Sequence, residues 1–295
     1  MKKVVVVGGA VLDVFAYPHE KFILNDSNPG YLKTSLGGVA RNIAENLARL
    51  DIDTTLVTML GKDEGKKQIM QNAQDVMLKL SSIPATKTPT YIAILNEENE
   101  MVAAVADMDE IELLSKEHIK KRDVIFKNAD YIVLDTNLNL DTLQYIFKTY
   151  DKEFYIDVIS CKKAEKIKPF YRYIHGLKLN ILEAKHLSGL DTDCEEVLAK
   201  YFISQGVKEV YLTLGQKGSI YMSKEEIVKT PSHQVEIKNT AGAGDAFLAG
   251  IIYGKIHELN IIDCAQKAAE ITLQSKKAVN DDMSREKIEE DLWNI

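Results

Sequence analysis

The stretch of the chain best suited to chemistry is NTAGAGDAFLAGIIYG, residues 239–254. Small residues at positions 241–244 run directly into an apolar helical pattern, so several backbone N–H groups would point outward at a helix N-terminus with no side chains in the way. Such a turn attracts anions, and Asp245 stands where its carboxylate can accept a proton from a hydroxyl that attacks a phosphoryl group. The amides expected to stabilise the developing charge are those of Gly242, Ala243 and Gly244. The expected chemistry is phosphoryl transfer to an alcohol.

The same stretch has a plainer interpretation, as a glycine-rich loop that only lets a helix pack close to a strand. Two better-known phosphate-binding motifs are absent from the chain. A G-x-G-x-x-G motif fails because Phe247 takes the place of the third glycine. Residues 61–67, GKDEGKK, have the wrong spacing for a Walker loop and lack its Ser or Thr. A Rossmann dehydrogenase and a P-loop NTPase are therefore both disfavoured.

The overall composition, 45% hydrophobic and 27% charged, is that of an ordinary globular protein. The balance of 44 acidic against 37 basic residues gives a net charge of -7, which repels polyphosphate backbones, and no basic stripe overrides it. No apolar stretch approaches the roughly 20 residues that are needed to cross a bilayer. We therefore expect neither a nucleic acid nor a membrane as a partner.

The cysteines and histidines bear on the cellular location and on whether the protein is a metal hydrolase. Cys161, Cys194 and Cys264 lie far apart with no C-x-x-C spacing, which favours a reducing, cytoplasmic location. The opening MKKVVVVGGA breaks at Gly8 and Gly9, so it predicts a buried first strand and not a signal peptide. The six histidines show no H-E-x-x-H or comparable spacing, so a metal hydrolase is not supported.

Short hydrophobic runs between amphipathic stretches predict a mainly parallel α/β sheet. The runs are apolar at consecutive positions, as strands covered by helices on both faces require. They fall at residues 4–7, 54–59, 131–134, 154–158, 177–179 and 210–214. The clearest helix covers residues 39–50, with an apolar stripe that packs and a polar face that can serve a ligand. That polar face comprises Asn42, Glu45, Asn46 and Arg49.

Two segments, residues 15–36 and 90–106, break this rhythm with strand-like pieces that lack an intervening helix. The second predicts a hairpin of TYIAIL and MVAAVA across a polar turn. We expect the pieces to form a small β-sheet lid over an α/β core of residues 1–14, 37–89 and 107–295, which would bind its ligands at the strand ends. The alternative is an edge extension of the main sheet.

Residues 37–44, GGVARNIA, and residues 239–245, NTAGAGD, stand about 200 residues apart. Together, and in this order, they resemble the two signatures of the ribokinase-like (PfkB) carbohydrate kinase family, and the resemblance extends over essentially the whole chain. It implies a three-layer α/β fold with a mainly parallel central sheet and a β-sheet lid. It also implies a kinase that uses ATP and Mg²⁺.

The resemblance further implies which residues hold the substrate. Asp13 matches an acidic residue that grips substrate hydroxyls, and a carboxylate that accepts two O–H bonds suits a diol. Gly37 and Gly38 let the backbone approach the sugar, which Asn42 reaches from the first helical turn. Taken alone, Asp13 would be a turn residue and Asn42 a helix cap.

For the nucleotide, the resemblance implies Asn180 and Glu183 of NILE, which help to place Mg²⁺ and the phosphates, Glu183 through water. A helix N-cap is the plain alternative for this pair. Residues 268–280 match the region where the family builds part of its adenine pocket. The remaining implied nucleotide contacts are Thr213, Gly215, Gly218, Ala241, Gly242 and Gly244.

One position departs from the family pattern. The second signature commonly begins with Asp, whose side chain helps to hold a monovalent cation such as K⁺, and Asn239 stands there in this chain. A neutral amide binds K⁺ less strongly than a carboxylate does. Potassium activation is therefore not predicted.

Several local patterns bear on the acceptor: DSNPG at 26–30, GVARN at 38–42, the pair at 107–108, and LKLN at 177–180. Within the family, they most resemble members that phosphorylate the 5′-hydroxyl of pseudouridine. The uracil edge of pseudouridine offers an extra N–H, and polar side chains of the lid are its expected hydrogen-bond partners. The candidates are Asp26, Ser27, Asn28 and Asp107, with Asn137 beside the sugar, and each has the alternative of a polar turn residue.

Other acceptors stay open at this point, namely uridine, inosine and free ribose. From another class, the chain would be a non-catalytic sugar or nucleotide sensor, although a pure binder gains nothing from a base at Asp245. An exposed lid edge invites pairing with a second copy, so we expect a homodimer through the lid.

Overall fold

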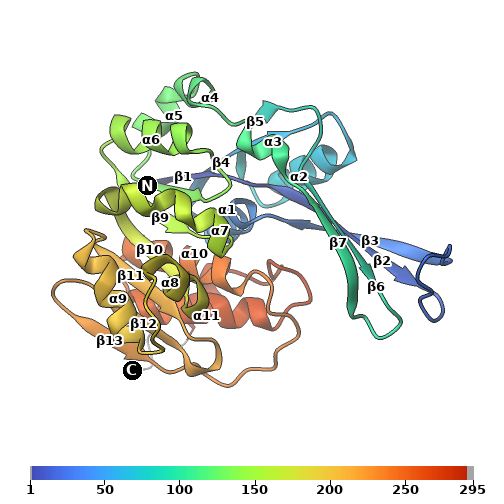
Figure 1. Cartoon of the computed structure of the whole chain (residues 1–295). Helices are drawn as coiled ribbons and strands as arrows, with labels where there is room; N and C mark the ends of the chain where they lie inside the picture. Colours follow the sequence, from blue (N-terminus) through green and yellow to red (C-terminus); the bar gives the residue numbers. More distant parts are fainter. Residues whose placement is uncertain (1, 291–295) are drawn as a thin grey trace.

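The central layer of the molecule is a mostly parallel sheet (Figure 1). The computed structural model describes residues 2–290, and within them this sheet has nine strands in the order β13-β12-β11-β10-β9-β8-β1-β4-β5. Their bounds are β1 Lys3–Val7, β4 Asp53–Leu60, β5 Lys79–Pro84, β8 Tyr131–Asp135, β9 Glu153–Asp157, β10 Ile174–Asn180, β11 Glu209–Thr213, β12 Ser219–Met222 and β13 Ile227–Thr230. The pairings β11–β12 and β12–β13 are antiparallel. The predicted α/β sheet is confirmed.

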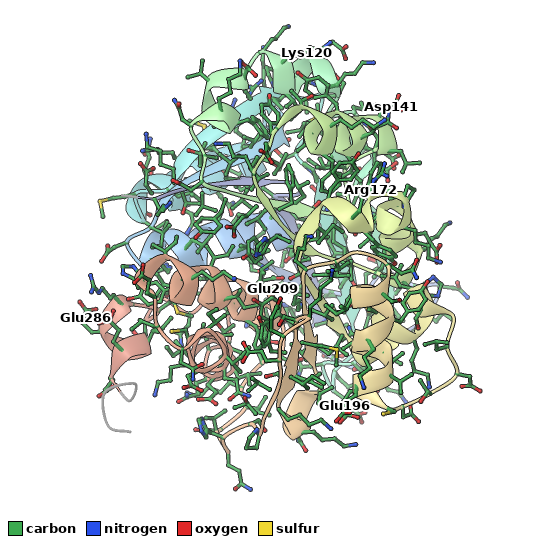
Figure 2. The ribbon with its side chains drawn as sticks, turned by 90° about the vertical axis from the view of Figure 1, so that its left-hand side faces the viewer. Lys120, Asp141, Arg172, Glu196, Glu209 and Glu286 are labelled. Atoms are coloured by element: carbon green, nitrogen blue, oxygen red, sulfur yellow. The ribbon has the colours of Figure 1, made fainter. Side chains whose placement is uncertain are left out.

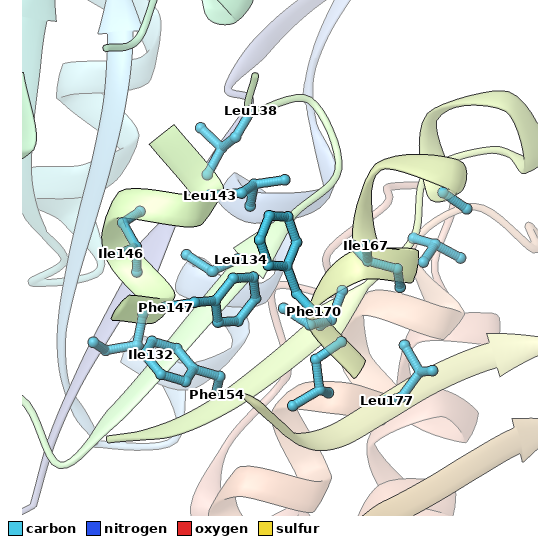
Figure 3. Packing of buried hydrophobic residues seen from close by; sticks show 14 of the residues in the cluster. Ile132, Leu134, Leu138, Leu143, Ile146, Phe147, Phe154, Ile167, Phe170 and Leu177 are labelled. Carbon is cyan, nitrogen blue, oxygen red and sulfur yellow. The ribbon is translucent and has the colours of Figure 1, made fainter. Parts of the chain in front are cut away.

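Alternate residues of the inner strands enter two separate hydrophobic cores, one on each face of the sheet. Val5 and Val7 of β1 belong to one core, and Val4 and Val6 belong to the other. Figure 3 shows part of the first core, where the ring of Phe147 stacks on that of Phe170 with centroids 5.1 Å apart and meets Phe154 edge-on. Burial on both faces explains why these strands are apolar at consecutive positions.

Helices form the outer two of the three layers. One core receives side chains from α1 (Val39–Arg49), α2 (Glu64–Asp75), α10 (Ala243–His257), α11 (Ile261–Leu273) and α12 (Arg285–Glu289). The other receives them from α6 (Leu140–Thr149), η1 (Glu165–Tyr173), α8 (Ile181–Ser188) and α9 (Glu195–Ser204). The short helices are α3 (Asp109–Glu112), α4 (Lys116–Lys120), α5 (Asp123–Lys127), α7 (Cys161–Ala164) and η2 (Gly215–Lys217).

Helix α1 confirms the helix predicted for residues 39–50, but its polar face is not open. Asn42, Glu45 and Asn46 are all buried. The helix lies against α10 as well as against β1 and β4, so protein surrounds it on nearly every side. The polar residues of this helix thus bond largely to other parts of the protein, and the expectation that they serve a ligand stays a prediction.

The remaining four strands form a separate sheet that projects from the core (Figure 1). They are β2 (Val11–Pro18), β3 (Gly30–Gly37), β6 (Thr90–Leu95) and β7 (Met101–Asp107), in the order β3-β2-β6-β7. The predicted hairpin and lid sheet are confirmed. The edge-extension alternative is wrong, because among the described residues none of these strands pairs with the nine-stranded sheet.

Edge strands carried too weak a pattern to be predicted. Strand β5, KLSSIP, has two serines at its centre, and all four residues of β13 are at least partly exposed. Helix α12 buries Ile288, whereas its residues Arg285, Glu286 and Lys287 are exposed.

Charged side chains surround the hydrophobic interior (Figure 2). Lys120, Glu196 and Glu286 lie near the outline of that view, whereas Glu209, at the start of β11, lies closer to its centre. Burial disfavours the Glu209 charge, but hydrogen bonds from His175 and Lys255 outweigh it and lower the pKa of Glu209 to about 2. Within residues 2–290, no helix has the length and apolar character to cross a membrane.

Candidate active site

The candidate active site lies at the carboxyl ends of the parallel strands, where α10 begins. Asp245, in the first turn of that helix, is only 7% exposed. Gly242 precedes the helix at φ +81°, in the left-handed region, and a Cβ there would overlap the carbonyl of Ala278. The first intrahelical bond runs from Ala246 N to Gly242 O, so the amides before Ala246 have no helical acceptor. Of the three expected amides, Ala243 N donates to the Thr240 carbonyl at 3.4 Å, whereas within residues 2–290 the amides of Gly242 and Gly244 have no acceptor.

A lysine that the sequence analysis did not single out lies beside this turn. A Cβ at Gly244 would overlap the Nζ of Lys178, which projects from β10. Lys178 Nζ donates to both carboxylate oxygens of Asp157, at 2.9 and 3.2 Å. A lysine in a strand that is otherwise apolar, as in GLKLN, is the signal that could have revealed it, because a buried ammonium needs a partner. The site thus adds a positive charge to the amides of the turn.

Electrostatics at Asp245 suit a base. Burial, and then the charge of Asp157, raise the pKa of Asp245 to about 7, although Lys178, Asn42 and Arg41 oppose the rise. Burial also disfavours the Lys178 ammonium, but Asp157 and Asp245 outweigh it and raise the pKa of Lys178. A carboxylate with a pKa near neutrality is a far stronger proton acceptor than an exposed one.

Asn42 connects the two signature segments directly. Its Nδ2 donates to Asp245 Oδ2 at 2.7 Å, across 203 positions of sequence. Its Oδ1 accepts from Arg41 at 2.6 Å, so both polar atoms of the carboxamide bond to protein. In this structure Asn42 holds Asp245, whereas its predicted contact with a sugar stays a prediction.

Asp13 lies on the lid side of the site. It is a strand residue of β2 and not part of a loop, and it adjoins Gly37 at the end of β3, where a Cβ would overlap its carboxylate. Burial raises the pKa of Asp13 to about 6, and the charge of Arg41 opposes the rise. Gly38 then precedes α1 with φ +95°. The structure thus places Asp13 and both glycines where the lid joins the core.

A second buried carboxylate, Asp135, also escaped the sequence analysis. It ends β8 and accepts hydrogen bonds from Gly9 N at 2.7 Å and from Asn137 N at 2.9 Å. Asn137 Nδ2 donates to Asp135 at 3.1 Å, and Asn137 Oδ1 accepts from Lys163 Nζ at 2.7 Å. Burial raises the pKa of Asp135. Asn137 is therefore held within a polar network at the strand ends.

The predicted readers of a base lie on the lid, away from this cluster. Asp26, Ser27 and Asn28 are exposed in the loop between β2 and β3, at the far end of the lid in Figure 1. Asn28 bonds to Ile23 of its own loop, at 2.7 Å to the amide and 2.8 Å to the carbonyl. Asp107 ends β7 and pairs with Lys87 at 2.5 Å. The structure does not bring these side chains together with Asp245.

Asn180 and Glu183 sit at the start of α8, just past β10. Asn180 Oδ1 accepts from Glu183 N at 2.9 Å, and Glu183 Oε2 accepts from Asn180 N at 2.8 Å, which is a reciprocal helix cap. Within residues 2–290, the other oxygen of Glu183 accepts no hydrogen bond. Thr213 ends the neighbouring strand β11, Gly215 begins η2 in the turn that follows, and Gly218 comes directly after η2.

The residues at the monovalent-cation position do not fit a cation. Asn239 Nδ2, a donor, faces the Lys276 carbonyl at 3.1 Å, and Asn239 Oδ1 accepts from Ala241 N at 3.0 Å. A cation needs oxygen ligands, and here a hydrogen atom points at the carbonyl. The segment of residues 268–280 lies against this loop, because Lys238 N donates to the Leu273 carbonyl at 2.8 Å. Within the segment, Asn280 Nδ2 donates to Ile271 O at 2.6 Å.

Comparisons with known proteins agree with this arrangement. The family described as pfkB family carbohydrate kinase matches residues 1–284. A pseudouridine kinase of Escherichia coli (strain K12) is 33% identical over 257 residues, which cover 84% of this chain and 82% of the relative.

Two solved structures are also similar to this one. A carbohydrate kinase from Agrobacterium tumefaciens is 28% identical, with a TM-score of 0.87 over 99% of this chain and 97% of the other. An Arabidopsis thaliana ribokinase complexed with ribose and ATP shares the fold at 20% identity, with a TM-score of 0.80 over 99% and 98%. On the family match and the 33% identity, the chain belongs to the pfkB family of carbohydrate kinases, phosphotransferases that act on an alcohol group of a sugar or nucleoside.

Proposed function

We propose that this protein transfers the γ-phosphoryl group of ATP to the 5′-hydroxyl of pseudouridine, giving pseudouridine 5′-phosphate and ADP. The observation that carries the chemistry is the position of Asp245, buried in the first turn of α10 beside unpaired amides and Lys178. The choice of acceptor is supported by the 33% identity to a pseudouridine kinase. Phosphorylation of a metabolite with ATP fits a cytoplasmic location.

Asp245 takes the proton of the attacking hydroxyl. Its Oδ2 is held by Asn42, so Oδ1 is the oxygen that faces the incoming alcohol. As the O–P bond forms, the amides of residues 242–244 and the Lys178 ammonium stabilise the negative charge on the phosphoryl oxygens. ATP with Mg²⁺ supplies the phosphoryl group, and Asn180 and Glu183 are the residues expected to hold it, Glu183 through water.

We expect the acceptor to be bound where the lid joins the core. Asp13 accepts hydrogen bonds from the ribose hydroxyls, with Gly37 and Gly38 allowing the sugar to approach the backbone. The lid, residues 15–36 and 90–106, would have to close over the core, residues 1–14, 37–89 and 107–295, for Asp26, Ser27, Asn28 or Asp107 to reach the base. A partner's lid is a second way to bring such side chains to the site.

The test is ATP-dependent phosphorylation of pseudouridine, uridine, inosine and ribose at equal concentration, followed by ADP release and by mass spectrometry of the product. We expect the highest kcat/KM with pseudouridine, and uridine is the matched control because it has the same atoms joined by N1 instead of C5. A preference for any other acceptor would overturn the substrate, whereas no ADP release with any acceptor would favour a sensor.

A further inference from the structure

Arg41 is a buried cation with no role yet in the proposed reaction. Its side chain is 4% exposed, and its Nη1 donates to Glu45 Oε2 at 2.5 Å and to Asn72 Oδ1 at 3.2 Å. Its Nη2 donates to Asn42 Oδ1 at 2.6 Å, while Nε is buried with no partner among the described residues. Burying a guanidinium with an unsatisfied donor costs free energy, so stability alone does not account for an arginine here.

We propose that Arg41 is a positioning residue for the catalytic base: it orients Asp245 through Asn42, and its positive charge favours the ionised carboxylate. The inference rests on the proposed function, because it takes Asp245 to be the base.

The orientation follows from the donors and acceptors involved. A guanidinium can only donate, so Arg41 holds the Oδ1 of Asn42 toward itself. The carboxamide must then present Nδ2 to Asp245, which it does at 2.7 Å. Without Arg41, only Asp245 itself selects which end of the carboxamide faces it, and the flipped form would set two acceptor oxygens against each other. Arg41 therefore keeps Asp245 aimed at the incoming hydroxyl.

The charge of Arg41 is only partly neutralised. Glu45 is its buried ion-pair partner, but the other oxygen of Glu45 lies 2.9 Å from Arg49, whose second partner is the exposed Asp281 at 3.1 Å, so Arg41 shares the charge of Glu45 with Arg49. The groups that act on Asp245 are Asp157 from β9, Lys178 from β10, and Arg41 and Asn42 from α1. Of these, Asp157 raises the pKa of Asp245 and the other three lower it. Arg41 also opposes the raised pKa of Asp13.

The experiment measures kcat/KM against pH for three variants. In Arg41→Met, which keeps the length but removes charge and donors, we expect kcat to fall by ~10- to 100-fold and the acidic limb of the profile to move to higher pH. Arg41→Lys keeps the charge but loses the paired donors of the guanidinium. We therefore expect kcat to fall while the acidic limb of the pH profile stays near that of the wild type. Arg49→Met is the control, since it also removes a partner of Glu45 but does not bond to Asn42, and its limb should not move.

A merely structural arginine would lower the unfolding temperature of Arg41→Met and leave its acidic limb in place, and that result overturns the inference. If Arg41→Met does not fold, Arg41→Lys decides, because a wild-type kcat in that variant removes the orienting role. A second test combines Arg41→Lys with Asn42→Ala. In the Asn42→Ala variant, adding Arg41→Lys should lower kcat by a much smaller factor than it does in the wild type. An equal fall in kcat in the wild type and in the Asn42→Ala variant would contradict the inference that Arg41 acts through Asn42. Normal turnover in Asp245→Asn would instead sink the proposed function itself.

Discussion

Asp245 accepts a hydrogen bond from Asn42, is deeply buried and has a raised pKa, which suits a general base. Asp245→Asn keeps the shape of the side chain but cannot accept the proton. We expect kcat to fall by ~10³-fold, with KM for ATP and acceptor changed far less. Asp141→Asn, on the exposed surface of α6, is the control and should turn over normally. Turnover of Asp245→Asn within tenfold of the wild type would exclude this base.

The raised pKa of the same carboxyl group also makes the free energy of unfolding depend on pH. Because its pKa is about 7 when folded and near the ordinary 3.8 when unfolded, the folded protein binds the extra proton between these values, and stability falls as the pH rises through them. Asp245→Asn removes that loss. We expect it to raise the free energy of unfolding at pH 8 by on the order of 1 kcal/mol, with little difference at pH 4, in denaturant titrations followed by fluorescence. A variant less stable than the wild type at pH 8 would contradict the raised pKa.

How much of the site can be predicted differs from residue to residue. Asp245 and its turn can be predicted locally, because small residues and a carboxylate at a helix start are adjacent in sequence. Asp157 and Asp135 cannot be, and GLKLN shows that Lys178 needs a partner but not which one, since each of the three gains its partners only when the parallel sheet gathers the strand ends. The bond from Asn42 to Asp245 likewise depends on the packing of α1 against α10.

At the scale of elements, the loop that leads into α10 is tied to the segment after α11 by a side-chain amide. Asn239 Nδ2 bonds to the Lys276 carbonyl in place of a cation. We expect the wild-type rate to be the same in potassium chloride and in tetramethylammonium chloride at equal ionic strength. Asn239→Asp would set a carboxylate against that carbonyl, and its rate should then depend on K⁺, which can lie between the two oxygens. A wild-type enzyme that requires K⁺ would contradict this account.

The elements themselves were predictable in proportion to their burial. Inner strands such as β1 and β8 are apolar at consecutive positions because both faces are covered, and the pattern predicts them directly. Strands β5 and β13 lie at the sheet edges and have polar or exposed residues, so periodicity does not distinguish them from loops. The polar face of α1 could be predicted but its burial could not, because helical spacing shows where polar residues gather and not what covers them.

At the scale of the whole molecule, one face of the lid is left apolar and exposed. Residues alternate between the two faces of each strand, so Asp13 faces the site while its neighbour Val14 faces away, and the register places Thr34, Ile92 and Val105 on that outer face with Val14. The next level adds Leu32 and Ile94. Leu32 is 68% exposed and Val105 is 65% exposed, which is costly for a monomer in water.

We expect a second copy to cover this face, so light scattering should return twice the chain mass of 33.1 kDa. Leu32→Glu combined with Val105→Glu places like charges across that interface and should give the 33.1 kDa monomer. Met77→Glu, at an 81% exposed apolar residue outside the lid, is the control and should leave the dimer intact. Asp13 lies on strand β2 of the lid sheet. Relative to the wild type, we therefore expect the KM for the acceptor to rise more in the monomeric variant than the KM for ATP does. A wild-type mass of 33.1 kDa would mean that the apolar face is not an interface between copies.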